Sequence, residues 1–144
     1  SMEDIFLDQQ KKTWKSTYRS LDKKIKKAKT PGDFKYLFDS FLEDFVSDLG
    51  PDADLNWEVC SFIPVCLEFR EANKKVLANK IRNIIKRGWP GKTNNVLERQ
   101  TDLIILSFYG FIDYVIHKPK KERAKILKDF RNMLNLHLQD RLFF

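Results

Sequence analysis

The chain has 144 residues and a net charge of +7; 33% of its residues are charged and 42% are hydrophobic. This balance is typical of an ordinary soluble globular domain. Glycine and proline number only five each, which are too few turn residues for a protein of many strands. We therefore expect residues 1–144 to form a single all-α domain, a compact bundle of about five main helices. The alternative all-α architecture is a HEAT-like stack of helical hairpins.

Both ends of the sequence suggest that it is one part of a longer protein. Ser1-Met2 is typical of a cloning scar, and the chain stops at Phe143-Phe144 within a helical pattern. We interpret the sequence as a domain excised from a longer protein. No secretory signal is visible, because the first ten residues are acidic and polar.

Helical periodicity is clear in the first third of the chain. One apolar face predicts a first long helix, whose other face carries lysines: Leu7, Trp14, Tyr18, Leu21, Ile25 and Ala28. Thr30, Pro31 and Asp33 then fit the cap, first position and third position of a second helix. This helix carries the strongest apolar stripe, from Phe34 to Leu49, and Gly50-Pro51 ends it.

Residues 55–69 are apolar on nearly every side, which predicts a third helix buried against several neighbours and capped by Asp52 or Asp54. Pro64 predicts a kink or break within it, after which an amphipathic pattern continues to Gly88. Cys60 and Cys66 are six positions apart in what we take as one helix. That spacing puts them on different faces and argues against a disulfide between them. Such cysteine usage indicates an intracellular protein, cytoplasmic or nuclear.

The last part of the chain predicts two further helices. Asn95 and Glu98 resemble a capping pair, and we expect residues 95–117 to form a buried central helix. Its apolar run of fourteen residues, 103–116, is too short to span a membrane. Pro119 opens the final helix, which has an apolar stripe to Leu138. Among the apolar residues we expect five to be buried: Phe38, Phe41, Phe45, Leu106 and Phe130.

The stretch KRGWPGKT, residues 86–93, ends like a phosphate-binding loop. The pattern requires a glycine at position 86, where Lys86 stands, and a strand before it, where the periodicity is helical. Pro90 also lacks the backbone N–H that such a loop uses to hold phosphate. We interpret the stretch as a helix–helix connector. Trp89 within it either folds back on the core or stands exposed as an anchor for a partner.

Residue types suited to metal binding or catalysis are sparse and badly spaced. No C-x-x-C or H-x-x-x-H pattern exists, and the two histidines, His117 and His137, are twenty positions apart. The cysteines lie in the most apolar segment, where a thiol normally fills space in the core. We expect neither metal nor cofactor, and no enzymatic activity.

Charge is strongly segregated along the chain. Residues 11–29 contain nine basic groups and one acid, residues 33–54 contain seven acids and one base, and the chain beyond residue 73 is basic again. The lysines at the start of the last helix oppose its dipole, and such unfavourable placement suggests a site. We therefore expect the basic surface that binds a partner to comprise Lys74, Lys75, Arg82, Lys86, Arg87, Trp89, Lys118, Lys120, Lys121 and Arg123, rather than the lysines of the first helix.

These observations favour a non-enzymatic helical domain, an adaptor or scaffold, that binds an acidic protein partner through a basic surface. The alternative is a helical domain that binds RNA or DNA. The acidic second helix opposes that alternative, and so does the lack of an aromatic and basic platform of a known module.

Overall fold

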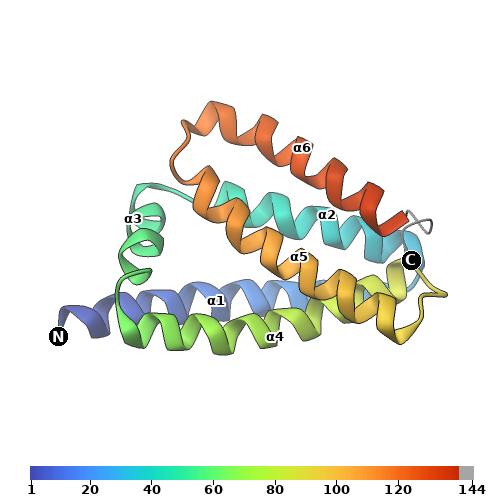
Figure 1. Cartoon of the computed structure of the whole chain (residues 1–144), viewed down its shortest axis with the longest axis horizontal. Coiled ribbons are helices and arrows are strands. Elements are labelled where there is room, and N and C mark those ends of the chain that lie inside the picture. The colour runs from blue at the N-terminus through green and yellow to red at the C-terminus, as the bar shows by residue number, and fades with distance from the viewer. Residues whose placement is uncertain (140–144) are drawn as a thin grey trace.

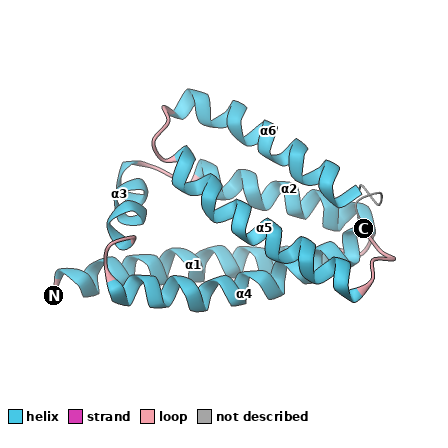
Figure 2. Ribbon diagram, in the orientation of Figure 1, coloured by secondary structure: helices cyan, strands magenta, loops and turns pink. Residues whose placement is uncertain are grey.

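The computed structural model describes residues 1–139, apart from the side chain of Pro51. Within that range it has six α-helices and no strand (Figures 1 and 2). Their order is α1 (Met2–Lys27), α2 (Pro31–Ser47), α3 (Pro51–Cys60), α4 (Pro64–Gly88), α5 (Asn94–Val115) and α6 (Lys120–Gln139). The predicted all-α bundle is confirmed. The predicted helical end of the chain at Phe143-Phe144 lies outside the described residues.

The helices form one bundle in which the most extensive packing joins α2 with α4 and α4 with α5. These contacts differ from a stack of hairpins, in which each helix packs mainly on the next one in sequence. Helices α1 and α4 run side by side along one edge of the molecule, α6 covers the opposite edge, and α3 stands across one end (Figure 1). None of the described helices combines the length and apolar character needed to cross a membrane.

The helix boundaries follow local sequence signals in most places. The Thr30 side chain accepts a hydrogen bond from the Asp33 N–H, and the Asp33 carboxylate accepts one from the Thr30 N–H, so the predicted capping box of α2 is confirmed. Helix α5 differs from the prediction, because its N-cap is Thr93 and not Asn95. Glu98 is not part of a cap but forms an ion pair of 2.7 Å with Arg82.

The predicted third helix is broken, not kinked, and the break adds a sixth helix. Pro64 occupies the first turn of α4, and the three preceding residues leave helical geometry. The expectation that residues 55–69 are buried on nearly every side is wrong for four apolar side chains, which are exposed on α3, at the break and in the first turn of α4: Leu55, Phe62, Val65 and Leu67. The short α3 packs mainly against α1 and also contacts α4. The buried Trp57 of α3 meets the rings of Phe45 of α2 and Tyr109 of α5, so the expected contact with several neighbours holds for this inner side of the helix.

The core centres on aromatic rings from α1, α2 and α5. The Trp14 ring centroid lies 5.3 Å from that of Phe45 and 6.5 Å from that of Phe108. Four of the five predicted core residues, all of them Phe, are buried. Leu106 is 72% exposed, so its assignment to the core was wrong. Helix α5 buries ten residues, but its outer face carries three exposed apolar side chains: Leu103, Leu106 and Tyr114.

Candidate partner-binding surface

The stretch that resembles a phosphate loop serves the fold from Gly88 to Thr93. Gly88 ends α4 against α2, where an added Cβ would lie 3.3 Å from the Phe34 Cβ. Gly91 has a φ of 94°, which favours glycine. The Lys92 ammonium donates a hydrogen bond of 2.7 Å to the Leu138 carbonyl, and Thr93 caps α5. These contacts support the interpretation of residues 86–93 as a connector.

Trp89 is a core residue and not an exposed anchor. Its side chain is buried, and its ring meets that of Phe38 edge to face at 5.9 Å. The Lys35 ammonium lies 5.6 Å from the Trp89 ring centroid on the outer side. The sequence left two roles open for Trp89, a core residue or an exposed anchor, and the structure supports the first. Trp89 is therefore not part of the candidate surface.

Arg123 is also buried, and its surroundings explain why a basic residue lies in the first turn of α6. Its guanidinium forms an ion pair of 2.7 Å with Asp54 and donates to the Lys118 and Ile116 carbonyls at the end of α5. Positive charge is favourable at the end of a helix. The argument that unfavourable charge marks this place as a site therefore does not hold for Arg123, which is committed to the fold.

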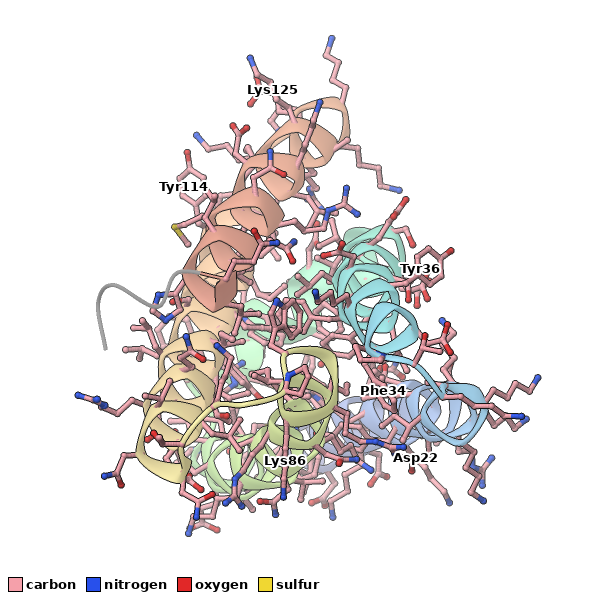
Figure 3. The ribbon with its side chains drawn as sticks, turned by 90° about the vertical axis from the view of Figure 1, so that its right-hand side faces the viewer. Asp22, Phe34, Tyr36, Lys86, Tyr114 and Lys125 are labelled. Carbon is pink, nitrogen blue, oxygen red and sulfur yellow. The ribbon has the colours of Figure 1, made fainter. Side chains whose placement is uncertain are left out.

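The remaining predicted site residues lie in two separate places. Lys118, Lys120 and Lys121 border the start of α6, with the Lys118 ammonium 4.9 Å from the Tyr114 ring centroid. The others lie on α4, on the opposite edge of the molecule (Figures 1 and 3). In Figure 3, Lys86 of α4 is at the bottom of the view and Lys125 of α6 at the top. The residues of α4 and those at the start of α6 therefore do not form the single surface that we expected.

Helix α4 instead lies beside α1, whose lysines we had set aside. The Tyr18 hydroxyl donates to the Asn73 side chain at 2.6 Å, and the Lys80 ammonium donates to the Asp22 carboxylate at 2.8 Å. Because residue numbers rise together along these contacts, the two helices are parallel. Their basic segments run in register: residues 11–29 carry nine bases and one acid, and residues 72–97 carry seven bases and no acid.

The contact between Asp22 and Lys80 marks a seam with exposed residues on both sides. Residues three, four or seven positions from one of them lie on the same side of its helix. We define the α1–α4 face by eight exposed residues. Six follow this spacing: Lys15, Arg19, Lys26, Val76, Asn83 and Arg87. The other two are further exposed lysines of α4, Lys75 and Lys86. Two other predicted residues are partly engaged, because Arg82 pairs with Glu98 and Lys74 pairs with Glu71.

No protein-family model, curated protein or solved structure matches the chain. The α1–α4 face is therefore assigned from its own chemistry alone. Its basic side chains are exposed, and its middle carries the apolar Val76, which is 45% exposed. The three exposed aromatic residues of the described chain lie elsewhere, on α2, at the α3–α4 break and on α5: Tyr36, Phe62 and Tyr114.

Two groups with strongly shifted pKa values, Tyr109 and Cys60, are buried, and a third, Tyr18, is half-buried beneath the Lys80 ammonium. Burial raises the pKa of Tyr109 to about 12, and it also raises the pKa of Tyr18. Burial, with a contribution from the adjacent Cys66 thiol, raises the pKa of Cys60 to about 12. At neutral pH these groups keep their protons, so none of them is an activated base or nucleophile in this buried state. In residues 1–139 no three side chains of the His, Cys, Asp or Glu type are grouped to hold a metal ion.

Proposed function

We propose that this chain is a non-enzymatic helical domain that binds an acidic protein partner through the α1–α4 face. The observation that carries the proposal is the parallel packing of α1 on α4, which joins two basic segments that are separate in sequence. Complementary charge of this kind accelerates association and selects partners. The exposed Val76 among the bases supports a protein partner, because it offers an apolar contact that a phosphate backbone does not use.

Binding to the backbone of double-stranded nucleic acid is the second candidate. The excess of bases over acids along α1 and α4 favours it, since phosphate contacts need only positive charge. A stacking platform for single strands is not formed by the described residues of this face, because the Tyr18 ring is covered by the Lys80 ammonium at 5.0 Å.

The test compares two charge-reversed variants that change net charge equally. One carries Arg19→Glu, Lys26→Glu and Lys75→Glu on the α1–α4 face; the matched control carries Lys120→Glu, Lys121→Glu and Lys125→Glu on α6. Fluorescence anisotropy measures the binding of a Glu-rich amphipathic peptide to each. We expect the first variant to lose roughly tenfold or more in affinity, and the control to stay near wild type. Equal losses would show that net charge, not this face, attracts the peptide.

Val76→Ser separates the two candidates. It should weaken the peptide and leave binding of a duplex RNA or DNA of similar charge unchanged, because only the peptide offers apolar side chains. The same titrations at about 50 and 200 mM salt measure the number of phosphate contacts. Tighter binding of the duplex, with a steep salt slope and no effect of Val76→Ser, would favour nucleic acid over protein.

A further inference from the structure

The break between α3 and α4 brings the two cysteines of the chain together. Cys60 is the last residue of α3 and Cys66 lies in the first turn of α4. Their sulfur atoms are 3.1 Å apart, and both side chains are 0% exposed. This corrects the expectation that they lie on different faces of one helix, and removes the argument against a disulfide between them.

The separation of the two sulfurs is suited to bond formation. A disulfide bond is about 2.0 Å long, so the sulfurs need to approach by only about 1 Å. Both thiols are free in this structure. Within the described residues no third His, Cys, Asp or Glu completes a metal site with them.

The surroundings of the pair keep the Cys60 thiol protonated at neutral pH. Burial disfavours the Cys60 thiolate and raises the pKa of that thiol. The thiolate is the form that reacts with oxidants. The connection beside the pair is short and lies outside both helices, and its Phe62 is 81% exposed. Because both sulfurs are fully covered, reaction with an oxidant requires this connection to open.

We propose that Cys60 and Cys66 form a reversible intrachain disulfide when the protein meets a peroxide or a small-molecule disulfide. With hydrogen peroxide, one thiolate attacks an oxygen, breaks the O–O bond and becomes a sulfenic acid, while the other oxygen leaves as hydroxide and is protonated to water. The second thiolate attacks the sulfenic sulfur, forms the S–S bond and releases a second hydroxide, which is protonated in turn. Two thiols and one peroxide give one disulfide and two waters.

The disulfide would lie directly under the first part of α1. The Phe6 carbonyl accepts a hydrogen bond of 3.3 Å from the Asn56 side chain, and the Cys60 sulfur lies 3.8 Å from the same oxygen. Oxidation therefore fixes the turn on which the start of α1 is seated. We expect slower amide hydrogen exchange in residues 2–10 of the oxidised protein, because their docking site opens less often.

Mass spectrometry of the whole chain tests the proposal. After treatment with oxidised glutathione, the protein should lose the mass of two hydrogen atoms and yield a linked peptide containing residues 60 and 66, and dithiothreitol should reverse both changes. Cys60→Ser and Cys66→Ser are matched controls, each expected to form a glutathione adduct on its remaining thiol instead. Two independent adducts on the wild-type protein, or two unreacted thiols, would overturn the proposal.

Thermal melting of the oxidised wild-type chain supplies a readout that needs no variant. A short intrachain disulfide in native geometry should raise the melting temperature by roughly 5 °C. An unchanged or lower melting temperature would show that the bond distorts the fold, and would contradict the claim that the native structure holds the two sulfurs ready to react.

Discussion

Arg123 and Asp54 are 69 residues apart in sequence and form two hydrogen bonds, of 2.7 and 3.3 Å, between guanidinium and carboxylate. The Arg123 side chain also reaches the Ile116 carbonyl at 3.1 Å. One side chain of α6 therefore holds the start of α3 and the end of α5. The basic start of α6 is stabilised by this contact, which links three elements.

Replacing Arg123 by Ala should destabilise the fold by about 3 kcal/mol, because it leaves the partly buried Asp54 carboxylate and two carbonyls without their donor. Lys121→Ala, two residues earlier on the exposed side of α6, should change stability by less than about 0.5 kcal/mol. Urea denaturation of both variants measures the difference. A loss below about 1 kcal/mol for Arg123→Ala would place that residue among ordinary surface positions.

Replacing Gly88, at the end of α4, and Gly110, within α5, by alanine should change the stability of the fold in opposite directions. Gly88→Ala places a Cβ 3.3 Å from the Phe34 Cβ and 3.4 Å from the Lys35 nitrogen, and should cost about 1–3 kcal/mol by forcing α2 and α4 apart. Gly110→Ala meets nothing within 4 Å on α5 and should stabilise by about 0.5–1 kcal/mol. The same thermal melting experiment measures both, and a shift of the same sign in each would contradict the close approach at Gly88.

Phe41 and Leu106 test the core directly, because the sequence predicts burial for both. Phe41→Ala should cost about 3–5 kcal/mol, since the ring is 5% exposed and stacks on Phe108 at 5.8 Å. Leu106→Ala should change stability by less than about 0.5 kcal/mol, since the side chain is 72% exposed. Equal losses in urea denaturation would mean that the outer face of α5 is covered in solution.

Asp33 should make stability depend on acid pH. Its carboxylate accepts hydrogen bonds from the Lys29 and Thr30 N–H groups at 2.9 and 3.0 Å, which lower its pKa below the usual value. The resulting stabilisation is fully present above the unfolded pKa, about 3.9, and is lost as the pH falls through the lower folded value. Asp33→Asn should therefore be less stable than wild type at pH 7.

The difference between wild type and Asp33→Asn should shrink steadily in urea midpoints measured from pH 6 down to about pH 2. At the acid end both proteins carry a neutral side chain at this position, so the two curves should meet. A gap that stays constant over the whole range would show that the carboxylate charge makes no contribution, and that only the shape of the side chain matters.

Local signals in the sequence predicted most of the fold. Thr30, Pro31 and Asp33 specify the start of α2 through contacts within a few residues, and the apolar spacing of α1, α2 and α6 identifies the face each one buries. Such features depend only on residues close in sequence, so they can be predicted without knowledge of the tertiary packing. The position of Thr93 as the cap of α5 followed the same rule, but Asn95 offered an equally good local signal two residues later.

The break at residues 61–63 could not be read from periodicity, because Pro64 is compatible with either a kinked helix or the first turn of a new one. Assigning one helix then placed Cys60 and Cys66 on different faces, and the folded turn brings them together. The exposed face of α5 was missed for a related reason. A helix that is apolar on most sides has no polar stripe to show which of its sides remains uncovered.

The candidate surface depended on which helices are neighbours, and no local signal carries that information. Lys86 of α4 and Lys120 of α6 are both exposed, as expected, but their helices lie on opposite edges of the bundle (Figure 1). The contact between Asp22 and Lys80, which joins α4 to α1, spans 58 positions. A pattern of charge along the chain predicts that basic surfaces exist, and only the packing of helices decides which of them merge.

The acidic helix α2 forms ion pairs with basic residues of two neighbouring helices, α1 and α6. Its Asp44 pairs with Lys24 of α1 at 2.7 Å, and its Glu43 pairs with Arg131 of α6 at 3.1 Å. A long polyanion lying along α1 therefore meets the carboxylates of α2 if its footprint extends from α1 across α2 to α6. On that side of the bundle, the acidic surface of α2 limits how far a bound anion can extend beyond the basic residues of α1.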